Sequence, residues 1–330
     1  MIGGKLRTIN YRDALKEALI EEMDHDDKVF IIGEDVGVYG SSFKVTSGLI
    51  EKYGSKRVID TPISENTIAG TGVGAAIHGM RPVVDISYID FMTLAMDPVA
   101  NGAAKIPVFS PGLYKMPLVV RTQGGLGKGV GGHHAQSLEA WFVHTPGLKV
   151  VMPSTPYDAK GLLKTSIRDN EPVMFIENKK LYLVEGEVPE KEYFIPLGKA
   201  DIKRKGTDLT IISTSYMVHE SLKAASILEK ENINVEIIDP RTLVPFDKDT
   251  VINSVKKTGK VLIVHEAVKR GGVGAEICAI IVEEAFNYLT SPVVRLAAPN
   301  VVIPANSYLD RYCIPTVEDI VSKVKEMLKK

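Results

Sequence analysis

Short apolar runs rich in β-branched residues alternate with helical patterns along this chain, in two successive series. Such alternation is typical of an α/β protein with a mostly parallel sheet. The first series has candidate strands at 29–32, 57–59, 82–86, 118–121, 149–152 and 173–177, with helices such as 11–23 and 156–168. The second has strands at 209–212, 235–238, 261–264 and 293–296, with helices around 217–231, 274–287 and 316–329.

Two series in 330 residues predict two domains, because the chain exceeds one typical domain. Between them, the polar stretch 186–192 contains Pro189 and has no period, which indicates a linker. We therefore expect one domain at 1–182, a linker at 183–205 and a second domain at 206–330. Each domain should be a mostly parallel sheet flanked by helices.

Composition and charge exclude several classes of protein. A formal net charge of -1 without a dense basic block argues against a nucleic-acid surface. The two cysteines, Cys278 and Cys313, are too few for a disulfide scaffold and fit a reducing compartment. No long uncharged apolar run predicts a membrane span, and the first residues lack an apolar signal segment. We expect a cytoplasmic protein without an anchor.

The segment 60–66 places one acid, Glu65, at a predicted switch from strand to helix. Pro62 has no amide hydrogen for the sheet ladder, so the strand should end there. The helix that follows contains Gly70, Gly72 and Gly74, each costing roughly 1 kcal/mol relative to alanine. This cost predicts that another part of the same domain, or another subunit, approaches the helix closely. Glu65 alone decides little, because an acid in a first turn also complements the helix dipole.

Several familiar motifs do not match. The glycines at 70–74 lack the spacing of a dinucleotide fingerprint, and 124–128 lacks the spacing and hydroxyl of a phosphate loop. His133 and His134 are adjacent, so in an extended segment they point to opposite sides and do not suit one zinc ion. They end the glycine-rich loop 122–132, where an imidazole could act as acid or base, or could simply cap a helix or meet a carbonyl.

An ordered set of segments extends nearly from end to end: 33–37, 59–65, 133–141, 146–154, 167–172, 195–200 and 272–277. Together they resemble the β subunit of thiamine-diphosphate-dependent 2-oxo acid dehydrogenase E1 components of the pyruvate and acetoin type. The resemblance implies that the first domain is a pyrimidine-binding thiamine-enzyme domain. It implies that the second is a transketolase C-terminal-like domain used in dimerisation and docking.

The resemblance also assigns roles to single residues. Glu65 corresponds to the glutamate that binds N1′ of the cofactor's aminopyrimidine. A proton shared there favours the imino form that removes the thiazolium C2 proton, which a glutamine could not exchange. Phe91 corresponds to the aromatic that packs on the pyrimidine, a plain core position being the alternative, and Ile63 is also assigned to cofactor binding. His134 corresponds to the residue that helps acyl transfer to lipoamide, whereas the role of His133 stays open.

A structural potassium site is a further implication of the resemblance. Its donors would be the main chain of Leu118, Ser166 and Ile167 together with Asp169 and Glu171. Carbonyl and carboxylate oxygens suit a hard cation. A solvated helix end is the alternative interpretation of 168–171.

The chain contains no Gly-Asp-Gly motif, which enzymes of this group use to hold Mg²⁺ and the diphosphate. The resemblance therefore implies an E1 α subunit that holds Mg²⁺ and the diphosphate, in an α2β2 heterotetramer. The pair would be an oxidoreductase, EC 1.2.4.-, that decarboxylates a small 2-oxo acid, pyruvate foremost, or cleaves acetoin. It would pass the acyl unit to a lipoyl group on an E2 acyltransferase, with no nucleic acid or membrane as partner.

Several alternatives stay open. The substrate could be pyruvate, acetoin, 2-oxobutyrate or a branched-chain acid. The chain could instead be a transketolase-like or deoxyxylulose-phosphate-synthase-like half enzyme, which needs basic phosphate-binding residues where the loop 122–134 offers only Lys128. A non-catalytic assembly subunit is the third alternative.

Overall fold

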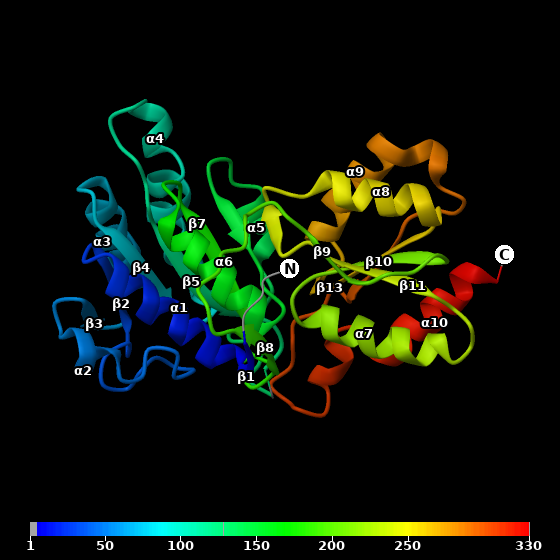
Figure 1. Ribbon diagram of the computed structural model, residues 1–330, viewed down its shortest axis with the longest axis horizontal. Coiled ribbons are helices and arrows are strands. Elements are labelled where there is room, and N and C mark those ends of the chain that lie inside the picture. Colours follow the sequence, from blue (N-terminus) through cyan, green and yellow to red (C-terminus); the bar gives the residue numbers. More distant parts are fainter. Residues whose placement is uncertain (1–4, 128, 330) are drawn as a thin grey trace. The chain divides into compact units, whose positions relative to one another are not determined.

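The computed structural model describes residues 5–127 and 129–329, which form two compact units (Figure 1). The N-terminal unit comprises Met1–Gly124 and Trp141–Leu197, and the C-terminal unit comprises Gly125–Ala140 and Gly198–Lys330. The segment 125–140, which we expected in the first domain, is thus grouped with the C-terminal unit. The expected linker at 183–205 contains two strands, β8 (Glu185–Pro189) and β9 (Asp201–Arg204).

The N-terminal unit is built on a parallel sheet. Its strands are β2 (Val29–Glu34), β3 (Val58–Thr61), β4 (Arg81–Ile86), β5 (Val119–Gly124), β6 (Lys149–Val151) and β7 (Val173–Asn178), in the order β6-β7-β5-β4-β2-β3. All neighbouring pairs are parallel, so the carboxyl ends of the strands meet at one edge of the sheet. Pro62 follows directly after β3, as its missing amide hydrogen predicts.

Helices cover this sheet (Figure 1). The elements are α1 (Tyr11–His25), α2 (Leu49–Tyr53), α3 (Glu65–Ile77), η1 (Ile89–Thr93), η2 (Asp97–Ala103), α4 (Ile106–Phe109), α5 (Glu139–Val143) and α6 (Pro156–Arg168), and β1 (Leu6–Asn10) pairs antiparallel with β8. Helices α1 and α6 pack side by side, and α3 packs on β4. A Cβ on Gly72 would lie 2.4 Å from Cγ2 of Val84, so this glycine permits the close approach, whereas Gly70 and Gly74 face open space.

The C-terminal unit repeats the α/β pattern. Its strands β10 (Leu209–Ser213), β11 (Val235–Asp239), β13 (Val261–Val268) and β14 (Val294–Ala298) form the order β14-β13-β10-β11-β9, in which only β9 is antiparallel, and β12 is Thr242–Val244. In Figure 1, α7 (Tyr216–Glu229) and α10 (Val317–Leu328) cover one face, and α8 (Lys248–Thr258) and α9 (Val273–Ala285) the other, with η3 (Phe286–Tyr288) and η4 (Asp310–Cys313) in the connections. The predicted fold class is confirmed.

The apolar core of this unit includes two residues from far earlier in the chain. Leu126 and Ala135 pack among the buried side chains of β10, β11, α7 and α10. The 125–140 segment is therefore a structural part of the C-terminal unit. Within the described ranges, each helix is too short or too polar to cross a lipid bilayer.

Candidate functional site

The predicted acid, Glu65, lies at the carboxyl edge of the N-terminal sheet. Strand β2 ends at Glu34, directly opposite Thr61 at the end of β3, and α3 begins four residues later. Ligand sites of parallel α/β sheets commonly form at this edge, where neighbouring strands lead into different connections. The topology thus places Glu65 where such a site is expected.

The Glu65 side chain is buried but lacks a polar partner. The residue is 9% exposed, and no donor or cation within residues 5–127 and 129–329 contacts its carboxylate. Asn66 Nδ2 donates a 3.4 Å hydrogen bond to Leu94 O, which joins the start of α3 to the turn that carries Phe91. Glu65, Phe91 and Ile63, which is 72% exposed, therefore belong to the same edge.

Negative charge accumulates at this edge. Burial raises the pKa of Glu34, and the charges of Asp35, Glu65 and Asp60 raise it further. Sequence reasoning did not select Glu34 as a site residue, although its position at a strand end beside the Glu65 turn was a usable signal. An edge of this kind favours a ligand that brings a proton or a positive charge.

Phe91 is held by an unusual backbone turn. It lies in η1, after Tyr88, whose φ of 72° is rare for a residue with a side chain. Gln123 Oε1 accepts a 3.2 Å hydrogen bond from the Tyr88 amide, and the Tyr88 and Phe91 rings meet edge to face at 6.1 Å. Tyr88 and Gln123 were missed from sequence because the strain shows only in three dimensions.

A buried ionic cluster lies next to Gln123, the residue that holds this turn. Arg121 on β5 is 0% exposed and pairs with Asp85 at 2.8 Å and Glu177 at 2.7 Å. Burial opposes the charge of Arg121, but Glu177 and Asp85 outweigh it and raise its pKa further. Gln123 Nε2 also lies 3.4 Å from Asp85, so the cluster supports the residue that holds Tyr88.

The predicted histidines lie in the other unit. His134 is half-buried and His133 is exposed, both in the 125–140 segment of the C-terminal unit. The His134 amide donates a 3.2 Å hydrogen bond to Gly131 O, which tightens the turn before it. The structure thus brings Glu65, Ile63 and Phe91 together in one unit and assigns His134 to the second.

The predicted potassium donors are engaged by protein groups. Arg81 Nη1 donates to Ile167 O and Asp169 O, both at 3.0 Å. Lys149 Nζ lies 2.7 Å from the Asp169 carboxylate and 2.8 Å from that of Glu171. Lys149 would therefore share these carboxylates with a bound cation, because each carboxylate keeps a second oxygen.

Two carbonyls of the predicted set keep one acceptor position. Leu118 O accepts from the Val173 amide at 2.9 Å, and Ser166 O accepts from the Asp169 amide at 3.3 Å. A carbonyl oxygen has two lone pairs, so each can accept a second partner. The two carbonyls can therefore accept a further partner beside their amide hydrogen bonds.

Two family models match successive parts of the chain. "Transketolase, pyrimidine binding domain" matches residues 7–184, and "Transketolase, C-terminal domain" matches residues 198–320. A solved structure described as "Split gene transketolase, inactive beta4 tetramer" has a TM-score of 0.80 at 23% identity, covering 98% of this chain and 99% of that one. At that identity the likeness shows the fold alone.

Curated relatives are more similar in sequence. "2-oxoisovalerate dehydrogenase subunit beta" of Bacillus subtilis is 45% identical, covering 98% of this chain and 99% of its own. "Pyruvate dehydrogenase E1 component subunit beta" of Gracilaria tenuistipitata is 45% identical, covering 96% and 98%. The mitochondrial protein of that name from Pisum sativum is 45% identical, covering 97% and 90%.

Proposed function

Since the chain belongs to the E1 β subunits of the 2-oxo acid dehydrogenases, we propose that it decarboxylates a small 2-oxo acid, pyruvate foremost, or cleaves acetoin. It would do so with an α subunit and thiamine diphosphate, and pass the acyl unit to a lipoyl group on E2. One observation carries the proposal: a buried, unpartnered carboxyl group, Glu65, begins α3 at the carboxyl edge of the sheet.

The residues at this edge fit the pyrimidine end of the cofactor. When bound, thiamine diphosphate supplies the carbon centre that adds to the 2-oxo group and accommodates the electrons released with CO₂. Glu65 would hold and exchange a proton at N1′, and its largely buried side chain has limited freedom to turn away. Phe91, half-buried and fixed by the Tyr88 turn, offers an aromatic face to the ring, and Ile63 offers an apolar contact.

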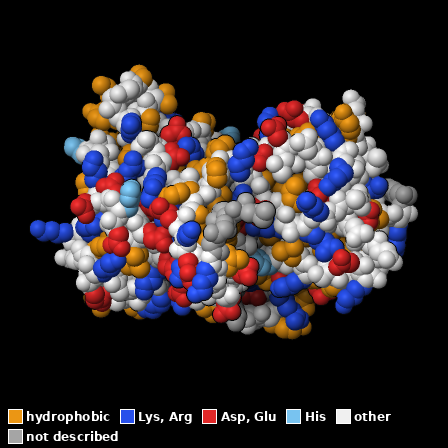
Figure 2. Space-filling view, viewed as in Figure 1, with side chains coloured by type: hydrophobic (Ala, Val, Ile, Leu, Met, Phe, Trp, Pro, Cys, Tyr) orange, Lys and Arg blue, Asp and Glu red, His pale blue; other side chains and the backbone are white. Residues whose placement is uncertain are grey.

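An α partner is supported by uncovered apolar surface. Figure 2 shows hydrophobic side chains gathered over α4, where Val108, Phe109 and Leu113 are 71%, 75% and 76% exposed. Patches of this kind often mark protein interfaces. Gly70 and Gly74 leave open space on α3. The α subunit would hold Mg²⁺ and the diphosphate, for which this chain lacks the Gly-Asp-Gly motif.

Potassium and localisation stay proposals. The ion would be bound by the main chain of Leu118, Ser166 and Ile167 with Asp169 and Glu171, whose carboxylates it would share with Lys149. A cytoplasmic location is supported by the two free thiols, Cys278 and Cys313.

Glu65→Gln tests the function. The chain is reconstituted with candidate α subunits, and decarboxylation is measured with an artificial electron acceptor. We expect assembly to be unchanged and the rate to fall about 10²- to 10⁴-fold, because glutamine cannot exchange the proton. Glu51→Gln, which changes an acid in the first turn of α2, is the matched control and should keep full activity.

Three outcomes distinguish the alternatives. Full activity of the Glu65→Gln heteromer would refute the assignment of Glu65. Turnover of a sugar phosphate in place of a 2-oxo acid would favour the transketolase-like half enzyme. If the heteromer assembles but calorimetric titration detects no binding of thiamine diphosphate, the chain would instead be a non-catalytic subunit.

A further inference from the structure

The loop that carries His134 is fastened to the C-terminal unit by two carboxylates. The Leu126 amide donates a short hydrogen bond to Glu266 on β13, and the Gly129 amide donates to Asp310 Oδ2 at 2.6 Å. Glu266 and Asp310 come from distant parts of the sequence and are 9% and 5% exposed. Hydrogen bonds from amides to buried carboxylates are stronger than those between neutral groups.

Close packing reinforces these hydrogen bonds. A Cβ on Gly129 would lie 2.9 Å from Ser307 N, and one on Gly132 would lie 2.9 Å from Cγ1 of Val302. Gly129 also has a φ of 69°, a conformation that glycine adopts without strain. The glycines therefore let the loop lie directly against the segment 302–307.

Glu266 contacts one end of the loop and lies near enough to the other to influence its charge. At the far end, burial raises the pKa of Glu139 to about 7, and the nearby charge of Glu266 contributes. Between Leu126 and Glu139, Gly132 and the residues from Ala135 to Leu138 line a cavity of about 160 Å³ together with the end of β13. The loop is thus attached to the C-terminal unit on both sides of the half-buried His134.

We propose that Glu266 and Asp310 are positioning residues that hold the His134 loop in the conformation used for acyl transfer. A glycine-rich loop would otherwise sample many backbone conformations, and ordering it in advance lowers the entropic cost of placing the imidazole. The C-terminal unit, expected to serve dimerisation and docking, thereby takes part in the reaction. This inference rests on the proposed function, in which His134 serves the transfer to lipoamide.

The test compares two readouts on the reconstituted αβ heteromer. In the double variant Glu266→Ala/Asp310→Ala, we expect transfer to free lipoamide to fall about 10- to 100-fold more than decarboxylation with an artificial acceptor. Hydrogen exchange of the peptide 122–138 should also become faster, because its amides lose their acceptors. The conservative variant Glu266→Gln/Asp310→Asn keeps carbonyl oxygens at both positions and should restore most of the transfer.

Asp247→Ala is the matched structural control. Asp247 is a 6% exposed carboxylate of the same unit that accepts the Ala200 and Thr250 amides and does not contact the loop. Its loss should lower the melting temperature without changing the ratio of the two activities or the exchange of 122–138.

The outcomes separate the inference from the function it rests on. An unchanged activity ratio in the double variant, or one equal to that of Asp247→Ala, would overturn the positioning role. Unchanged hydrogen exchange at 122–138 would overturn it even if no α subunit restores activity. The unaltered chain could also fail to support decarboxylation with any α subunit while hydrogen exchange in the double variant becomes faster. That result would refute the proposed function and, with it, the role of the two carboxylates in acyl transfer.

Discussion

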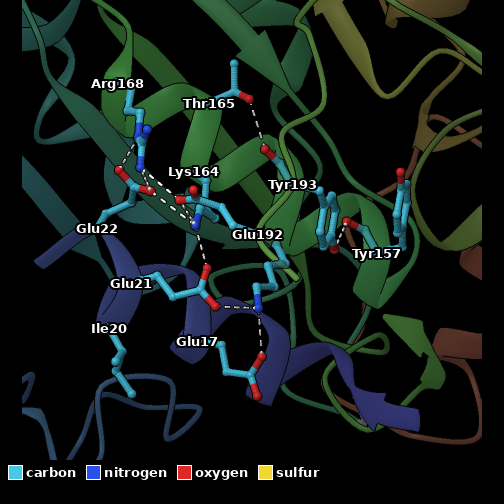
Figure 3. Close-up of polar contacts among 12 residues, drawn as sticks. Glu17, Ile20, Glu21, Glu22, Tyr157, Lys164, Thr165, Arg168, Glu192 and Tyr193 are labelled. Carbon is cyan, nitrogen blue, oxygen red and sulfur yellow. Dashed lines mark hydrogen bonds and ion pairs between the residues drawn. The ribbon is translucent and has the colours of Figure 1, made fainter. Parts of the chain in front are cut away.

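Two groups of charged side chains in the N-terminal unit differ in whether their carboxylates are paired with cations. Between α1 and α6, each carboxylate faces a cation (Figure 3), and the members are Glu17, Glu21, Glu22, Lys160, Lys164, Arg168 and Glu192. At the carboxyl edge of the sheet, Glu34, Asp60 and Glu65 gather, and none of the described residues gives them a cation. The carboxylates of the first group are paired with cations, and those of the second have no cation among residues 5–127 and 129–329.

The pKa values differ accordingly. Burial alone would raise the pKa of Glu21, but hydrogen bonds from Lys160 and Lys164 outweigh it and lower the value. The pKa of Glu34 is raised by burial and by its acidic neighbours. Paired charges stabilise the fold, whereas unpaired like charges destabilise it. Proteins tolerate such destabilisation where a ligand or partner binds.

Breaking the paired group should have the largest effect on stability. Lys164 is 0% exposed and contacts Glu21, Glu22 at 3.4 Å and Glu192 at 2.8 Å. Lys164→Met keeps an unbranched apolar side chain, one atom shorter, but leaves carboxylates without their cation, so we expect a loss of about 3 kcal/mol in the free energy of unfolding. Urea denaturation of the purified chain measures it.

Lys52→Met is the control for this prediction. Lys52 lies 2.7 Å from Asp24, but the two side chains are 46% and 50% exposed. Exposed pairs contribute at most about 1 kcal/mol, so the control should lose far less. Equal losses in both variants would show that the α1–α6 group is no more than a set of surface ion pairs.

Removing one charge from the unpaired group should have a smaller effect, of opposite sign. Glu34→Gln relieves repulsion with Asp60 and Glu65, and we expect a gain of about 0.5 kcal/mol at neutral pH. Thermal unfolding of the isolated chain measures it. Glu51→Gln, at an exposed acid in the first turn of α2, provides a control for the general effect of removing one negative charge. A loss of stability in Glu34→Gln would mean that the edge is not under repulsion.

Much of the fold follows from local sequence. The strands that begin at Val29, Lys149 and Val173 agree with the apolar runs, and the helix 156–168 agrees with the helical pattern and with capping by Thr155. The grouping of 125–140 with the C-terminal unit could not be predicted, because it depends on the amides of Leu126 and Gly129 meeting carboxylates 140 and 181 residues later. No local pattern records such pairs.

The candidate site divides in the same way. Glu65 was predictable because a strand end, Pro62 and a helix start coincide in seven residues, and the structure confirms that local geometry. Its role in catalysis stays a prediction. The support of Phe91 by Tyr88 and Gln123 needed three dimensions, since their contact joins the ends of two different strands.

The smallest effect should appear in the pH dependence of stability. As pH rises, the contribution of the paired group to the free energy of unfolding should increase and that of the unpaired group should decrease. Glu21 has a folded pKa below its ordinary 4.5, so its contribution is present above pH 4.5 and is lost as pH falls through the folded value. Glu34 has a folded pKa above 4.5, so its cost is absent below pH 4.5 and develops as pH rises through the folded value.

Denaturation of the unaltered chain, Glu21→Gln and Glu34→Gln from about pH 3.5 to about pH 8 tests this contrast. The advantage of the unaltered chain over Glu21→Gln should shrink towards acid, and the advantage of Glu34→Gln over the unaltered chain should grow towards alkali. Because each difference is taken against the same chain, titrations common to all three cancel. If the stability differences of Glu21→Gln and Glu34→Gln from the unaltered chain changed with pH in the same direction, the acids at the sheet edge would have to be neutralised within the chain. The contrast between the two groups would then be wrong.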